Sequence, residues 1–570
     1  MPVAPTYPGV YVEEIPSGVH TIIGVSTSET AFVDFFAQGP MNAATRITSF
    51  ADFERRFGGL DVRSEASYAI QQYFLNGGQV AWVVRVSTPG MKKATGALTH
   101  GTAPPKRSVL GIEAVTPGGW GNSLRARVDD DGLSTTDKAT MFNLTVEQVA
   151  DQGGRERVVA RESYRRLSLK VPEANYAPTV VNRASALVRI EDRGLGERPS
   201  LEVRTEVDET GQARQREAPQ VVRLAGGGDD DDNYDSNDNL IQRDGTIGKN
   251  AHGRLAQAIL GTAPTLEFPH PGVRALDRIA PFIFSILCLP VVAKLNAETR
   301  ARIVAAAQAF CRDRRAFYIV DPPFEAPSRE ARRGPKPADL ADPNSPGFVE
   351  LDGLRHENAA LYVPALVVPD PLNENRPLVV GPSGTIAGIY ARTDVERGVW
   401  KAPAGTAATL VGAGVEHTLT DLETGGLNPL GFNVLRTFPV FGNVCWGART
   451  LDGADQRASE WKYVPVRRTA LYIEESLYQG LKWAVFEPND EPLWAQIRLN
   501  VGAFMHTLFR QGAFQGQTRR EAYFVKCDRE TTTQNDINAG IVYVVVGFAP
   551  LKPAEFVIIQ IQQMAGQIQT

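Results

Sequence analysis

Short apolar stretches with the character of β-strands alternate with helical patterns in two separate parts of the chain, and this alternation constrains the fold most. In the first part the order is strand, helix, helix, strand, over residues 30–36, 50–57, 64–75 and 80–86. In the second part, apolar runs at 282–289, 316–320 and 360–368 accompany a helix over 297–312, for which Asn296 is a suitable N-cap. Strands that alternate with helices predict a mainly parallel sheet.

The region between these two parts has a different pattern. Residues 142–146 alternate strictly between apolar and polar, Gly153-Gly154 supplies a turn, and Val158-Val159 resumes an extended run. This pattern predicts a β-hairpin. We therefore interpret residues 91–245 as a β-rich insertion into the α/β domain.

An acidic run ends the insertion. It follows the glycines at 226–228 and extends from Asp229 to Asp238. Because it is so charged and so poor in apolar groups, we expect a mobile surface loop. The carboxylates suit calcium, but the run lacks the central glycine and terminal glutamate of an EF-hand loop, so a solvated loop is the prediction.

The C-terminal third predicts an α+β domain. Strands are expected at 435–438 and 444–449, and a helix at 470–483. A second helix begins near Asn489 or Asp490, with Pro492 in its first turn. Its apolar residues recur at helical spacing: Trp494, Ile497, Val501, Phe504, Met505 and Leu508.

The predicted fold class is α+β multidomain: an α/β domain with a β-rich insertion, a C-terminal α+β domain, and extended strand arms at both ends. The predicted boundaries are an N-terminal arm at 1–25, the α/β domain at 26–90 and 246–432, the insertion at 91–245, the C-terminal domain at 433–550 and a C-terminal arm at 551–570.

Composition excludes several classes of protein. The 570 residues carry a net charge of −5, so no basic excess indicates nucleic acid. The four cysteines form no C-x-x-C pair, which argues against a zinc ribbon or a disulfide framework and fits a reducing compartment. The first residues lack a signal-peptide pattern and no segment is apolar enough to span a bilayer, so we expect no membrane insertion.

No motif supports catalysis, a cofactor or a metal site. Gly381–Thr385 resembles a nucleophile elbow but has Thr385 where that turn needs glycine, and His356-Glu357 lacks the second histidine of a zincin helix. The glycine-rich stretches lack the lysine of a phosphate-binding loop. Glu487, Asp490 and Glu491 are read as helix-capping residues rather than an acid–base pair, and His506 as a core histidine. The prediction is a protein that is not an enzyme.

Two strand-like segments have no local partner. One lies among the prolines of residues 5–16, and the other is the apolar run 556–561. Unpaired strands recruit other chains, so recruitment can be their purpose. Packing of both segments on their own C-terminal domain explains them equally well.

Several blocks of the sequence resemble contractile tail sheath proteins of bacteriophages and of contractile injection systems. The blocks occur in one order: residues 7–14 (YPGVYVEE), 117–122, 142–146, 387–394, 398–403, 446–450, 472–476, 486–494 (FEPNDEPLW) and 533–537. They extend over nearly the whole chain. The main departure is the acidic run after Gly228.

The resemblance implies a subunit that polymerises as hexameric rings stacked helically around an inner tube protein, with baseplate and terminal cap proteins as further partners. It also implies assembly in the bacterial cytoplasm into a phage tail or injection particle. Strand arms would link subunits, through an N-terminal set of Tyr7, Pro8, Gly9, Val10, Tyr11 and Val12 and a C-terminal set of Phe556, Val557, Ile558, Ile559 and Ile561. On the predicted helix 470–483, Glu474, Glu475 and Lys482 are the candidates that face the tube, because a grip that must release should be polar. Solvated helix charges, or contacts between neighbouring sheath subunits, explain Glu474 and Glu475 at least equally well.

A second reading remains open from the residues alone. Strands that alternate with helices are also the framework of α/β hydrolases and nucleotide-binding enzymes with an accessory domain. The missing catalytic constellation and the two unpartnered terminal strands favour the sheath subunit.

Overall fold

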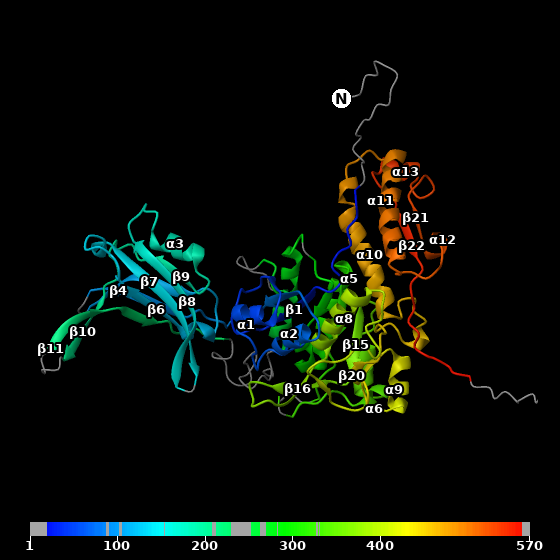
Figure 1. The fold of residues 1–570 in the computed structure, drawn as a ribbon, viewed down its shortest axis with the longest axis horizontal. Coiled ribbons are helices and arrows are strands. Elements are labelled where there is room, and N and C mark those ends of the chain that lie inside the picture. The colour runs from blue at the N-terminus through cyan, green and yellow to red at the C-terminus, as the bar shows by residue number, and fades with distance from the viewer. Residues whose placement is uncertain are drawn as a thin grey trace, which may run out of the picture.

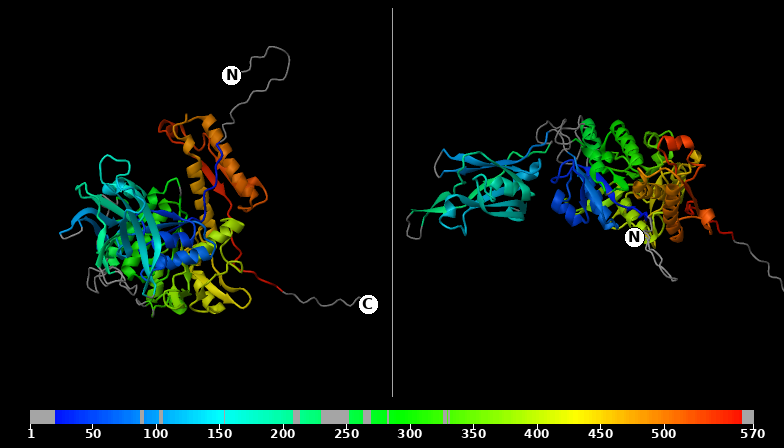
Figure 2. Two further views of the ribbon diagram at one scale, coloured as in Figure 1. Left: turned by 60° about the vertical axis from the view of Figure 1, so that its left-hand side comes forward. Right: turned by 90° about the horizontal axis from the view of Figure 1, so that it is seen from above.

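The computed structural model describes residues 20–86, 90–101, 105–152, 154–207, 213–229, 252–262, 269–281, 283–325, 329 and 331–560. These residues form an α/β domain, a set of β-sheets at one end of the molecule, and a pair of long helices on the other side that carries the C-terminal strands (Figures 1 and 2). The predicted mixed multidomain class is confirmed. No helix in the described ranges is long and apolar enough to cross a bilayer.

An eight-stranded sheet forms the centre of the α/β domain, and its inner strand pairs are parallel, as predicted. The edge pairs β2–β3 and β19–β20 are antiparallel. In spatial order the strands are β2 (Thr45–Ile47), β3 (Ala81–Arg85), β1 (Thr30–Asp34), β13 (Ile286–Cys288), β14 (Phe317–Val320), β15 (Ala359–Val363), β19 (Asn433–Phe438) and β20 (Gly442–Cys445).

Helices cover both faces of this sheet, which is why β1 is buried along its whole length. Phe32 of β1 packs with α2 and α8, whereas Ala31 and Val33 pack on the opposite face with α4 and α5. The helices of this domain are α1 (Phe50–Phe57), α2 (Glu65–Leu75), α4 (His252–Leu260), α5 (Ala297–Asp313), α6 (Pro337–Ala341), α7 (Pro346–Asp352), α8 (Ser383–Arg397) and α9 (Asp421–Leu427). Asn296 caps α5 as predicted, because its side chain accepts a hydrogen bond from the backbone N–H of Thr299.

Two predictions about strands need correction. The apolar run 360–368 is not one strand: β15 ends at Val363, and β16 (Leu366–Asp370) belongs to a separate small sheet with β17 (Arg376–Val380) and β18 (Gly414–Val415). The strands near 435 and 444 are β19 and β20, which extend the eight-stranded sheet from β15. The predicted domain boundary at residue 433 therefore lies inside the α/β sheet.

The β-sheets of the insertion lie apart from the α/β core (Figure 2). The predicted hairpin is confirmed as β7 paired antiparallel with β8. The elements are β4 (Thr95–His100), β5 (Arg107–Ala114), β6 (Leu124–Asp129), β7 (Met141–Gln152), β8 (Arg155–Ser168), α3 (Ala177–Ala184), β9 (Val188–Asp192), β10 (Glu202–Val207), β11 (Ala213–Ala218) and β12 (Gln220–Arg223). They form the sheets β4-β5-β9 and β12-β6-β7-β8 around their own apolar core, and the ribbon β10-β11.

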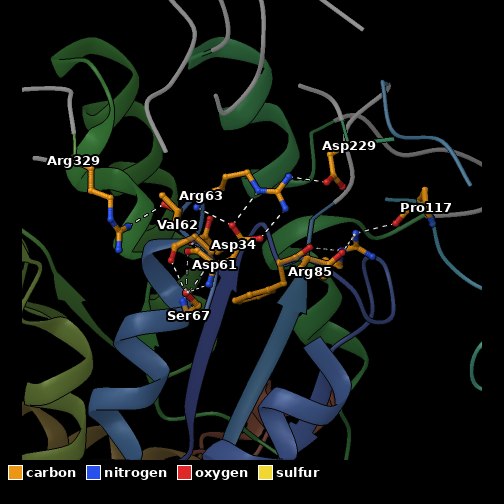
Figure 3. A network of polar contacts seen from close by, with 12 residues as sticks. Asp34, Asp61, Val62, Arg63, Ser67, Arg85, Pro117, Asp229 and Arg329 are labelled. Carbon is orange, nitrogen blue, oxygen red and sulfur yellow. Dashed lines mark hydrogen bonds and ion pairs between the residues drawn. The ribbon is translucent and has the colours of Figure 1, made fainter. Parts of the chain in front are cut away.

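Two arginines join the insertion to the α/β domain (Figure 3). Arg85, at the end of β3, is fully buried and donates to backbone carbonyls on the α/β side, including Phe36 at 2.7 Å, and to Pro117 of the insertion at 2.9 Å. Arg63 forms ion pairs with Asp61 at 2.8 Å and with Asp229 at 2.6 Å. The link is therefore held by directed polar contacts.

Asp229 contradicts part of the mobile-loop prediction. It is buried, and the preceding glycines are built into the insertion, where the backbone N–H of Gly228 donates to the carbonyl of Lys92. Arg63 is remote in sequence, and its positive charge offsets the desolvation cost of burying the Asp229 carboxylate. The rest of the acidic run, residues 230–238, lies outside the described residues.

Candidate functional site

The C-terminal helices form a unit with its own apolar core. Its elements are α10 (Val464–Gly480), α11 (Glu491–Arg510), α12 (Arg519–Ala522), β21 (Tyr523–Lys526), α13 (Gln534–Asn538) and β22 (Val545–Phe548). The predicted second helix is confirmed: Asp490 is its N-cap, Pro492 lies in its first turn, and Trp494 and Met505 are among its buried residues. The first helix begins six positions earlier than predicted, at Val464 instead of residue 470, with Pro465 in its first turn.

A two-stranded sheet on this unit has open edges. β21 and β22 pair antiparallel over four residues each, and no third strand pairs with either one in the described part of the chain. The ring of Phe524 lies over Gly547 of the opposite strand, in space that a side chain at Gly547 would occupy. A hairpin alone is marginal in water, and open edges accept further strands. This sheet can therefore accept a strand from another chain.

The C-terminal arm follows β22 and pairs with no strand among the described residues. Residues 551–560 form neither helix nor strand. Phe556, Val557, Ile558 and Ile559 are between 74% and 83% exposed, an unusual state for four consecutive large apolar residues. The predicted strand at 556–561 is not formed within the protomer as far as residue 560, and Ile561 lies outside the described residues.

A buried arginine fixes the root of the arm. Arg449 binds Glu555 through two contacts, Nε to Oε1 at 2.7 Å and Nη2 to Oε2 at 2.6 Å, and also binds Asp455 at 2.9 Å. Burial alone would lower the pKa of Arg449, but the paired carboxylates hold it above its ordinary value. We call this contact the Arg449–Glu555 clasp. The sequence gives no local signal for it, because its partners lie far apart in the chain.

The N-terminal set Tyr7–Val12 lies outside the described residues, but the segment that follows it is placed. His20 stacks on Trp483 with ring centroids 4.2 Å apart, and the Val25 N–H donates to Ser476 at 3.2 Å. Ile22 packs so closely on Gly480 that a β-carbon there would lie 2.7 Å from its side chain. The segment therefore runs along α10 toward the far end of the C-terminal unit (Figure 1).

The three tube-facing candidates lie in different environments. Glu475 is buried and pairs with Arg315 of the α/β domain at 2.6 Å, so within this protomer it is an internal link. Glu474 is half exposed, and burial raises its pKa although Arg467 lies 3.5 Å away. Lys482 is exposed and donates to Gln479 at 2.6 Å. Glu474 and Lys482 alone are available to a partner.

Buried polar residues near the rejected catalytic motif are structural. The Ser383 hydroxyl and N–H donate to the two oxygens of Asp321, at 2.5 and 2.8 Å, and both residues are buried. The Nδ1 atom of His356 accepts a hydrogen bond from the Asn358 N–H at 3.0 Å, and Glu357 lies 3.8 Å away. His506 is half-buried with Nδ1 unpartnered among the described residues, so it is not the satisfied core histidine that was expected. No group of three metal-ligating side chains occurs in the ranges described.

The Asp321 carboxyl predicts a pH dependence. Burial raises its pKa to about 7, above an ordinary value of 3.8. The folded state therefore holds a proton that the unfolded state releases, and this contribution is complete below about pH 3.8 and lost as pH rises through about 7. As the pH rises from 4 to 8, we expect the native chain to lose on the order of 2–4 kcal/mol of unfolding free energy that the Asp321→Asn variant does not lose. One pKa unit is worth about 1.4 kcal/mol.

Urea unfolding at pH 5, 6, 7 and 8 measures this difference. Asp421→Asn is the matched control, because that side chain is 92% exposed. A difference between native chain and Asp321→Asn that does not change with pH contradicts the assignment.

The whole chain has the fold of contractile sheath proteins. It matches the PVC sheath complex of an extracellular contractile injection system in the contracted state with a TM-score of 0.52, 20% identity and 98% coverage of both chains. It matches the sheath tail protein of Listeria innocua with a TM-score of 0.54, 14% identity, and 93% and 96% coverage of the two chains.

The sequence comparisons agree with the fold. Residues 456–564 match the family model of the phage tail sheath C-terminal domain. A prophage major tail sheath protein of Pseudomonas aeruginosa (strain UCBPP-PA14) is 29% identical over 177 residues, which are 30% of this chain and 43% of that protein. The tail sheath protein of Vibrio phage KVP40 is 29% identical over 126 residues, 22% of this chain and 18% of that protein. The aligned regions thus span less than half of these relatives, and the resemblance to tail sheath proteins is confirmed.

Proposed function

We propose that the protein is the structural subunit of a contractile sheath, in a phage tail or an injection particle. In this proposal it polymerises as hexameric rings stacked helically around an inner tube and contracts to drive the tube through a target envelope. One observation carries the proposal: an exposed, apolar C-terminal arm beside an open two-stranded sheet, in a chain with the sheath fold.

Strand exchange is the proposed link between subunits. An arm that adds to the open β21–β22 sheet of a neighbour forms several directional backbone hydrogen bonds, and the chain on either side of it can bend. Because the arm and the sheet are different surfaces, the contact is heterologous and does not close on itself unless the rotation closes a ring. Such a contact suits helically stacked rings.

Contraction in this proposal needs no enzyme. Two packings of the same subunits that differ in free energy supply the work, and a signal at the baseplate selects between them. Tube, baseplate and terminal cap proteins are the proposed partners, and the bacterial cytoplasm is the proposed place of assembly. Glu474 and Lys482 are the proposed tube contacts that remain, since Glu475 is paired within the protomer.

Electron microscopy of the purified full-length protein tests the proposal. We expect tubes with a regular helical pitch. A protein that stays monomeric across a wide range of concentration and salt would overturn it.

The insertion predicts a further result. Its first and last segments lie side by side, because the N–H of Lys92 donates to the Gly228 carbonyl at 2.8 Å. We propose that the insertion faces outward in the sheath, and we expect replacement of residues 92–228 by a short linker to leave tube formation intact. After excision Arg85 keeps its contacts to the carbonyls of Phe36, Ala37 and Gly39.

Tube formation and thermal unfolding of the excised chain are the measurements. An excised chain that folds but forms no tubes would show that the insertion is a lattice contact.

A further inference from the structure

A phenylalanine protrudes from the far end of the C-terminal unit. Phe486 has a relative exposure of 102%, and its neighbour Val485 is 63% exposed. The backbone of Phe486 is left-handed, with φ of 71°, a conformation that a bulky side chain adopts only under strain. A fully exposed apolar side chain gains no packing energy within its own chain that would compensate for this strain.

The loop that carries Phe486 is rigidly built. Asn489 donates through Nδ2 to the Ile541 carbonyl at 3.0 Å and accepts at Oδ1 from the Trp494 indole at 2.9 Å. The Glu487 N–H donates to the Ala484 carbonyl at 3.3 Å. A side chain that is held outward in advance loses little freedom when it binds, so the loop has the character of a preorganised anchor.

A groove of about 1100 Å³ lies at the opposite end of α11. Its apolar lining includes Trp400, Ala402, Ala404, Pro429, Trp446 and Pro553. Gln511, which follows α11, also lines the groove, whereas the Phe486 loop precedes the helix. The two surfaces are therefore separated by about 30 Å, the length of a helix of 20 residues.

Charge distinguishes the two surfaces. The loop carries Glu487 and Asp490, both exposed, whereas Glu491 at the start of α11 is paired with Arg498 at 2.6 Å. The groove is lined by Arg397, Lys401 and Lys552, and in the described part of the chain none of these three has a carboxylate at ion-pair distance. The acidic groove residues Asp421 and Glu555 are already paired, with Arg436 and Arg449. An acidic loop with an aromatic tip thus complements a basic groove with aromatic walls.

We propose that the Phe486 loop of one copy of this chain inserts into the Trp400–Trp446 groove of a second copy. The contact rests on the proposed assembly and adds to it a side-chain anchor distinct from strand exchange. Because loop and groove lie at opposite ends of α11, each copy can give and receive the contact, and the series of contacts continues unless the rotation between copies closes a ring.

Thiol crosslinking tests the contact. All four native cysteines are buried, so introduced thiols react alone at the surface. Polymers are formed from an equal mixture of Phe486→Cys and Ala404→Cys chains, at a concentration well above the critical concentration of the Phe486→Cys chain, and are treated with a short bismaleimide. We expect a crosslinked dimer whose linked peptides contain positions 486 and 404. A mixture of Leu499→Cys and Ala404→Cys is the matched control, because Leu499 is also exposed and apolar but lies within α11.

Polymerisation gives an independent readout. We expect Phe486→Ala to raise the critical concentration at least tenfold and Leu499→Ala to change it less than twofold, with unchanged thermal unfolding. Polymers that form without the 486–404 link above the control level overturn this contact and leave the proposed function intact. Failure of the native chain to polymerise overturns the proposed function itself. Links from position 486 to another surface of the chain, or only to added tube protein, also overturn the contact.

Discussion

A chain that ends at Glu555 is expected to fold as the full chain does and to form no sheath-like polymers. The deleted residues include Phe556–Ile559, which are almost fully exposed and so contribute little to the stability of their own protomer. We expect the free energy of unfolding to change by about 0.5 kcal/mol or less, as for other surface changes. Sedimentation and electron microscopy measure assembly, and urea unfolding measures stability.

A point variant distinguishes the effect of losing strand pairing from the effect of shortening the chain. Ile558→Pro removes one backbone donor from the proposed intermolecular ladder and should lower polymer yield at least tenfold. Ile558→Thr keeps the donor and the β-preference, so it should retain most of the assembly. Deletion of residues 1–15 should have the same effect as deletion of the C-terminal arm. Normal polymers from either truncated chain would contradict strand exchange.

The Arg449–Glu555 clasp should carry the largest stability effect of any single residue considered. Arg449→Met removes a guanidinium whose side chain is 1% exposed and leaves Glu555 without its charge partner. Breaking a buried ion pair from one side costs about 3–5 kcal/mol. We therefore expect a loss of stability of that order, together with faster amide exchange over residues 549–560.

Glu555→Gln is the milder comparison. It keeps the shape of the side chain and one acceptor for Arg449, so the expected loss is about 1–2 kcal/mol. Lys462→Met serves as a control, because it removes an ion pair of Asp455 that is partly exposed, with side-chain exposures of 26% and 48%. Equal stabilities of Arg449→Met and Lys462→Met would show that the clasp does not fix the arm.

Local patterns predicted local structure well. The bounds predicted for α1 match those observed, and Asn296 and Asp490 begin their helices as N-caps should. These signals lie within a few residues of the structure they specify. The sequence also predicted that residues 556–560 have no local hairpin partner, and in the described structure they form no strand within the protomer.

Long-range pairing could not be read from local patterns. The neighbour of β19 is β15, and nothing within residues 433–438 indicates that they complete an α/β sheet. The burial of Asp229 depends on Arg63, and that of Glu475 on Arg315. A charge run is solvated only if no remote partner neutralises it, and a single sequence does not name that partner.

The position of the clasp defines how the protein would carry mechanical load. Tension on the arm reaches Glu555 first and passes from there to Arg449. The Arg449 guanidinium donates to the carbonyl oxygens of Asn428 and Gly453. The backbone N–H of Arg449 donates to the side chain of Asn433 in β19. The force therefore enters the eight-stranded sheet and bypasses the small β21–β22 hairpin. In the proposed assembly, a pulled neighbour would shift the α/β domain while the β21–β22 hairpin stays intact to hold the next strand.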